Sequence, residues 1–84
     1  MLVKTSVPFG GVHGWLADLT VPAKNRTLSS VNSYYVAEAD EWRALAAIRI
    51  HTGVDDDAAL ASRRALSMRE VQRLGMKPGQ VLTA

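Results

Sequence analysis

The first part of the chain alternates apolar and polar residues with a period of two, a pattern typical of half-buried β-strands. Residues 3–7 alternate in this way until Pro8, which cannot donate a hydrogen bond to a strand ladder. They therefore predict a short edge strand or an extended arm. Residues 15–21 alternate again before Pro22 and predict a second strand, and the glycine-rich residues 10–14 between the two runs favour hairpin geometry.

A third strand is predicted over residues 28–36 by their β-branched and aromatic side chains. A polar turn at residues 23–27 precedes this run. Three serines and one asparagine within it are weaker strand formers, so the prediction depends on the valines and tyrosines.

From about residue 38 the spacing of the hydrophobic residues becomes that of a helix, and residues 38–48 predict one. Residues 38–48 carry acidic side chains in what would be the first helical turn, where the helix dipole favours negative charge. Gly53 follows at a position suited to a C-cap. The spacing of Trp42, Leu45 and Ile48 predicts that these three side chains form a buried stripe.

Two further helices are predicted after Gly53. The alanine-rich residues 55–66 predict the first, with the aspartates at positions 55–57 at its N-terminal end. Ser67 and Glu70 have the spacing of a capping box, so a short helix is expected to begin at Ser67 and to end at Gly75.

These elements predict a single α+β domain spanning residues 1–84. Residues 1–36 would form two to three short antiparallel strands or an extended arm, and residues 37–84 two to three short helices, a turn at 77–79 and a tail. A chain of this size buries only about 60–65% of the surface that its unfolded form exposes. It also has no cysteine and so no disulfide. Burial against a partner chain is the expected supplement to stability.

No arrangement of residues in the sequence points to catalysis. His13 and His51 lie far apart, no Gly-x-Ser-x-Gly elbow is present, and the glycines of residues 10–14 lack the lysine of a phosphate-binding loop. The aspartates at 55–57 do not have the alternating ligands of a calcium loop. We therefore expect no enzymatic activity, no bound metal and no cofactor.

A basic cluster in the last third of the chain offers an alternative function. Residues 66–76 resemble the first helix and turn of a helix-turn-helix unit, and the resemblance implies contact with nucleic acid. Too few residues follow the turn to form a recognition helix, and a net charge of +2 does not favour nucleic acid as the partner. The residues that would contact nucleic acid are Arg63, Arg64, Arg69, Arg73 and Lys77.

Four of the five aromatic residues lie in the first 36 positions, where glycine and proline predict little core. We therefore expect a structural or adaptor subunit of a larger assembly, in homo- or hetero-oligomeric contact with other protein chains. A small inhibitor of another protein is a further alternative. The arginine- and alanine-rich composition, typical of GC-rich genomes, favours a phage-like assembly. The predicted partner-binding residues are Phe9, Trp15, Leu19, Tyr34 and Tyr35.

The sequence contains no uninterrupted apolar run near the 20 residues that a membrane-spanning helix needs. Its first residues also lack the apolar core and cleavage site of a signal peptide. We expect no membrane contact, and a location in the cytoplasm of the producing cell, or in the virion if the chain is phage-encoded.

Overall fold

The computed structural model describes residues 11–22 and 30–84. The predicted strand at 3–7 and the predicted turn at 23–27 lie outside the described residues, as does Phe9. The described elements are, in chain order, β1 (Gly14–Val21), β2 (Ser30–Val36), α1 (Glu41–Thr52), β3 (Ala59–Leu66), α2 (Met68–Arg73) and β4 (Val81–Thr83).

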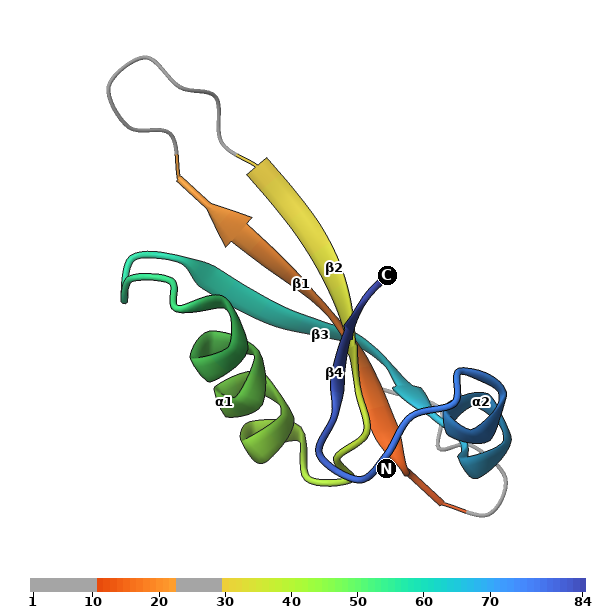
Figure 1. Cartoon of the computed structure of the whole chain (residues 1–84). Helices are drawn as coiled ribbons and strands as arrows, with labels where there is room; N and C mark the ends of the chain where they lie inside the picture. The colour runs from red at the N-terminus through yellow and green to blue at the C-terminus, as the bar shows by residue number, and fades with distance from the viewer. Residues whose placement is uncertain (1–10, 23–29) are drawn as a thin grey trace, which may run out of the picture.

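The four described strands form one antiparallel sheet in the order β3-β1-β2-β4 (Figure 1). β1 lies inside the sheet, paired with β2 on one side and with β3 on the other. α1 packs on one face of this sheet. The α+β class predicted from the sequence is confirmed, whereas the predicted order is wrong, because helices and strands alternate after β2.

The helix predicted over residues 55–66 is wrong, because residues 59–66 form β3. Alanine and arginine favour helices in isolation, but here they lie against β1 and supply its second ladder, from Gly14 opposite Leu66 to Thr20 opposite Ala59. Tertiary pairing thus outweighs the local propensity. The aspartates at 55–57 precede this strand and do not lie at a helix N-terminus.

The predicted tail after the turn at 77–79 is also wrong, because residues 81–83 form β4 on the outer side of β2. The turn is held against the end of β2 by two backbone hydrogen bonds. The N–H of Gly79 donates to the carbonyl of Ala37 at 2.7 Å, and the N–H of Ala37 donates to the carbonyl of Gln80 at 2.9 Å. The turn therefore directs the last residues into the sheet.

Local signals in the sequence placed the other elements correctly. β1 and the described part of the predicted third strand are confirmed. α1 ends at Gly53, whose φ of 66° is the left-handed conformation of a glycine C-cap. The helix begins at Glu41 rather than at 38, because the side chain of Asp40 caps it by accepting a hydrogen bond from the N–H of Arg43 at 3.0 Å.

The core lies between α1 and the two central strands. Ala17 of β1, Val36 of β2, and Ala44 and Ile48 of α1 are all fully buried and in contact. The two alanines are small, so the helix approaches the sheet closely. Six partly buried residues pack around this centre: Trp15, Tyr34, Leu45, Ala47, Leu60 and Val81.

Gly14, at the start of β1, is needed because of a close backbone approach. A Cβ atom at this position would lie 2.4 Å from the carbonyl oxygen of Val36 and 3.2 Å from side-chain atoms of Leu66 and Val71. A backbone carbonyl cannot move aside easily, so only glycine fits at this point.

Two isoleucines on α1 test the orientation of the helix. Ile48 is fully buried and Ile50 is 83% exposed. We expect Ile48→Ala to lower the free energy of unfolding by about 2–5 kcal/mol, because it leaves a cavity in the core. Ile50→Ala, the matched control, should change it by less than about 0.5 kcal/mol. Chemical denaturation of dilute protein measures both values, and equal losses would contradict this orientation.

Candidate functional site

The outward side of α1 carries an apolar stripe that faces solvent. Trp42, Ala46 and Ile50 follow one another at intervals of four residues, so they share one side of the helix. Trp42 is 82% exposed and Ile50 83% exposed. We call these three residues the outer stripe.

The outer stripe corrects the buried stripe predicted from the sequence. Ile48 is fully buried and Leu45 is partly buried against the core, but Trp42 is exposed. The buried side of the helix is centred on Ala44 and Ile48 instead. The missed signal was a second apolar spacing, that of Trp42, Ala46 and Ile50, which lies on the side of the helix opposite to Ala44 and Ile48.

α1 is therefore apolar on two opposite sides. A helix at the surface of a single domain normally presents charged or polar residues to water, and a helix that is apolar all round is normally buried. The fold of this chain buries only one of the two sides. The second side stays exposed among the described residues, with Arg43 and Arg49 beside it on the helix.

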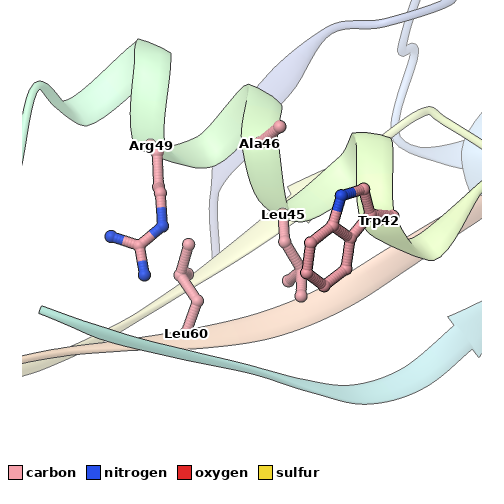
Figure 2. Close-up of a pocket in the computed structure, with 5 residues that line it drawn as sticks. All are labelled: Trp42, Leu45, Ala46, Arg49 and Leu60. Atoms are coloured by element: carbon pink, nitrogen blue, oxygen red, sulfur yellow. The ribbon is translucent and has the colours of Figure 1, made fainter. Parts of the chain in front are cut away.

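A groove runs between α1 and β3 beside the outer stripe (Figure 2). It has a volume of about 350 Å³ and is lined by Trp42, Leu45, Ala46, Arg49 and Leu60. Figure 2 shows Trp42 and Leu45 side by side on the helix, above β3, and Leu60 rising toward them from the strand. We call this the α1–β3 groove.

Arg49 closes one end of the α1–β3 groove. Its guanidinium donates a hydrogen bond to the carbonyl of Ala58 at 3.0 Å. This contact ties the last turns of α1 to the segment that enters β3. At the other end of the helix, the hydroxyl of Ser62 on β3 donates to the carboxylate of Glu41. The two contacts fix the helix and the strand as walls of the groove.

β3 is an edge strand among the described strands, because it pairs with β1 and lies at the end of the sheet order. Edge strands present unpaired backbone groups to which another strand can add. Ala59 and Ala61 of this strand are exposed among the described residues.

The basic residues predicted as a nucleic-acid site are divided among β3, α2 and the following turn. Two of them are paired with acids: Arg63 lies 3.5 Å from a carboxylate oxygen of Asp18, and Arg64 lies 2.7 Å from one of Glu70. Arg69, Arg73 and Lys77 are exposed. α2 is followed by a turn and β4, so residues 66–84 do not contain the second helix of a helix-turn-helix unit.

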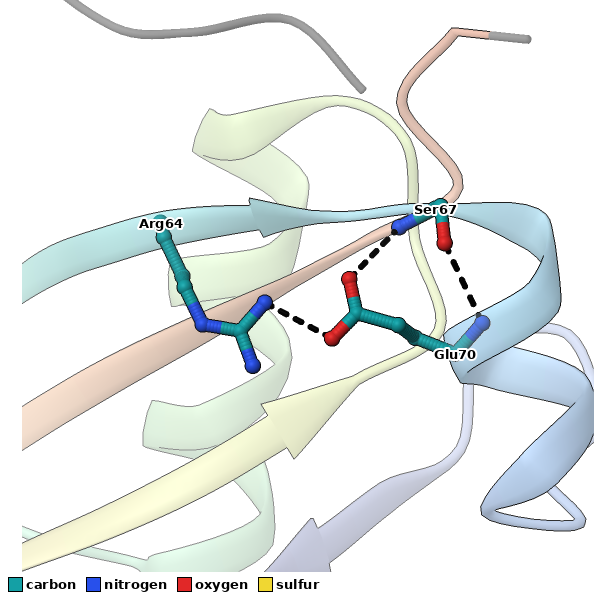
Figure 3. A network of polar contacts seen from close by, with 3 residues as sticks. All are labelled: Arg64, Ser67 and Glu70. Atoms are coloured by element: carbon teal, nitrogen blue, oxygen red, sulfur yellow. Dashed lines mark hydrogen bonds and ion pairs between the residues drawn. The ribbon is translucent and has the colours of Figure 1, made fainter. Parts of the chain in front are cut away.

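The capping box predicted at Ser67 and Glu70 is confirmed (Figure 3). The N–H of Glu70 donates to the hydroxyl of Ser67 at 3.2 Å, and the N–H of Ser67 donates to the carboxylate of Glu70 at 3.3 Å. The guanidinium of Arg64 also donates to this carboxylate and lowers the pKa of Glu70 below its ordinary value. Partial burial raises this pKa, and the Ser67 hydrogen bond lowers it.

The residues predicted to bind a partner are not gathered into one surface. Leu19 is 1% exposed and belongs to the chain's own core. Trp15 is half-buried, and its indole N–H donates to the carbonyl of Ala39 at 2.9 Å. Tyr34 packs against the core, with its ring edge-on to that of His51.

Tyr35 lies on the face of the sheet opposite to α1, because it follows Tyr34 along β2. It lines a cleft of about 220 Å³ together with two arginines and Glu70. The acid that pairs with Arg64 lies in the same cleft and offsets part of its positive charge. The full lining is Tyr35, Arg64, Glu70, Arg73 and Leu74.

Within residues 11–22 and 30–84, no group of three or more histidine, aspartate or glutamate side chains is placed to hold a metal ion. None of the helices described in this chain is long and apolar enough to cross a membrane. Comparisons with protein families, with curated proteins and with solved structures find no match. The candidate site is therefore defined by surface chemistry, and consists of the outer stripe and the α1–β3 groove.

The ion pair between Arg64 and Glu70 gives a prediction about pH. The pKa of Glu70 is lowered in the folded chain, so the ionised carboxylate stabilises the fold. This stabilisation is fully present above the unfolded pKa of about 4.3, and it is lost as the pH falls through the lower pKa that Glu70 has in the folded chain. We expect Arg64→Gln to return the pKa of Glu70 toward its ordinary value, as measured by NMR titration of the carboxyl carbon.

The control is Arg69→Gln, which removes an exposed arginine from the same helix as Glu70. It should leave the pKa of Glu70 unchanged. A Glu70 titration that does not move in Arg64→Gln would show that this ion pair does not set the pKa.

Proposed function

We propose that this chain is a non-enzymatic structural or adaptor subunit of a larger protein assembly, and that it binds a partner protein through the outer stripe of α1. One observation carries the proposal. Trp42 and Ile50 are more than four-fifths exposed on a helix whose opposite side already forms the core of the domain.

The energy available from the outer stripe is large for so small a domain. An aromatic ring buries about 150–250 Å² at an interface, which corresponds to about 4–6 kcal/mol at about 25 cal/mol per Å² before the entropic costs of association. Tryptophan is among the residues that most often dominate binding energy. Ala46, between Trp42 and Ile50, would let a partner approach the helix backbone closely.

Arg43 is exposed on α1 next to Trp42 and would lie at the rim of such an interface. Charges at a rim contribute more to the specificity and rate of binding than to affinity. The nucleic-acid alternative has less support, because its arginines lie on separate elements and two of them pair with acids. The phage-like setting is supported by composition alone and stays a prediction.

Site-specific photo-crosslinking tests the proposed binding face. A photoreactive phenylalanine derivative replaces Ile50 in cells that produce the chain, and cross-linked proteins are identified by mass spectrometry. We expect one reproducible partner. Adding Trp42→Ser should reduce its yield about tenfold or more, because that substitution removes the largest contact of the stripe.

The matched control places the same photoreactive residue at Gln72, which is exposed on α2. It should not capture the partner found at position 50. The free energy of unfolding of Trp42→Ser should stay within about 0.5 kcal/mol of the unsubstituted chain, because Trp42 is exposed. Equal labelling from positions 50 and 72, or labelling that Trp42→Ser leaves unchanged, would overturn the proposal.

A further inference from the structure

Two arginines border the outer stripe, one on each side of it. An α-helix turns by about 100° per residue, so Arg43 and Arg49 lie about 60° from the centre of the stripe, in opposite directions around α1. The acid of α1, Glu41, lies on the other half of the helix and accepts a hydrogen bond from Ser62 of β3. The outward half of α1 therefore carries two cations and no anion.

The acids near the start of α1 are engaged with backbone groups and leave the charge of Arg43 unpaired. Glu38 accepts a hydrogen bond from the N–H of Asp40 at 3.0 Å, and Asp40 accepts one from the backbone N–H of Arg43 at 3.0 Å. The described residues include every aspartate and glutamate of the chain, and none of these forms an ion pair with the guanidinium of Arg43. This exposed guanidinium can therefore contact an acid of a partner.

The other border of the outer stripe is mixed in charge. The guanidinium of Arg49 donates to the carbonyl of Ala58 at 3.0 Å, directly after the aspartates at 55–57. These three aspartates are exposed. An acidic partner is thus attracted to the border at Arg43 and repelled near residues 55–57, so the charges select its orientation as well as its sign.

We propose that the partner of the outer stripe is an amphipathic helix with acidic side chains along one border of its apolar face. The inference names the chemistry of the partner and rests on the binding function proposed above. The apolar side chains of this helix would cover Trp42, Ala46 and Ile50, and its aspartates or glutamates would face Arg43. One apolar side chain would enter the α1–β3 groove, which has a volume of about 350 Å³.

The spacing of the outer stripe suits a second helix. Side chains four residues apart form ridges on a helix, and the ridges of one helix pack into the grooves of another. From Trp42 to Ile50 the stripe is about 12 Å long, or about two helical turns. Ala46 at its centre would let the two helix axes approach to the distance of about 8–10 Å that is usual for packed helices. Amphipathic helices bind grooves through apolar side chains at these same intervals.

An anionic membrane surface and single-stranded nucleic acid are the other partners that an exposed tryptophan beside arginine attracts. A broad anionic surface would also meet the exposed aspartates at 55–57, which lie next to the Arg49 border, whereas a single helix can avoid them. Nucleic acid binds through stacked bases, but Ile50, Leu45 and Leu60 are aliphatic and offer no ring to stack on. The observations therefore favour a protein helix.

Selection from a peptide library tests the acidic border. The displayed peptides are helical, with leucine along one face and with Glu, Gln or Lys at random along both borders of that face. They are selected for binding to the intact chain. We expect glutamate to be enriched over lysine about tenfold or more along one border, because like charges across an interface are disfavoured. Trp42→Ser should abolish the selection if the peptides bind the outer stripe.

Arg43→Glu should invert this preference, so that lysine is enriched along the same border. Position 43 lies in the first turn of α1, where the helix dipole favours negative charge, so the variant is expected to fold, and circular dichroism checks this. For a selected acidic peptide, Arg43→Glu should raise the Kd about tenfold or more, and exchange of the peptide's glutamates for lysine should restore binding. The matched control is Arg69→Glu, an exposed arginine in the first turn of α2, which should change neither result.

Enrichment of lysine, the absence of any border preference, or a preference that Arg43→Glu leaves unchanged would overturn the acidic helix. So would a failure to select any peptide. Phosphatidylglycerol vesicles and oligothymidylate are the competing probes, and Trp42-dependent binding to either that is stronger than binding to the selected peptides would also overturn it. A protein captured at position 50 through a segment without acids would overturn this inference alone and leave the proposed function standing.

Discussion

The close packing of α1 on the two central strands is the contact on which the rest of the structure depends. Ala17 and Ala44 are small enough for helix and sheet to approach, and Val36 and Ile48 fill the space beside them. This contact sets the rotation of α1 about its axis. Once Ala44 and Ile48 face the sheet, residues 42, 46 and 50 must face away from it.

The same contact places the helix beside β3 and so creates the α1–β3 groove. The domain thus uses one side of α1 for its own core and leaves Trp42 and Ile50 on the other side exposed, the side that we propose as a binding face. A small domain without disulfides has a limited core, so burial of this side against the proposed partner would add to its stability. The polar contacts of Arg49 with Ala58 and of Glu41 with Ser62 join α1 to the β3 segment on either side of the groove.

Local signals in the sequence predicted the parts of the fold that depend on nearby residues. The C-cap at Gly53 and the capping box at Ser67 each involve groups within a few residues of one another. Residues 59–66 and 81–83 were missed as strands, because they are held by pairing with distant strands rather than by their own propensity. The outer stripe was missed because spacing on a helix shows which residues share a side, but not which side the sheet covers. Trp42 was therefore assigned to the core.

The two tryptophans allow a direct test of the claim that α1 has one side for the fold and one for a partner. Trp15 is half-buried and hydrogen-bonded within the chain, whereas Trp42 is 82% exposed. With both residues fluorinated, ¹⁹F NMR measures the shift of each resonance between H₂O and D₂O, and a Trp42→Phe variant assigns them. In dilute monomer we expect a full solvent shift for Trp42 and a smaller one for Trp15. In the assembled state, the shift of Trp42 should vanish while that of Trp15 stays the same. A Trp42 resonance already shielded from solvent in the monomer, or still fully exposed after assembly, would contradict this division of the helix.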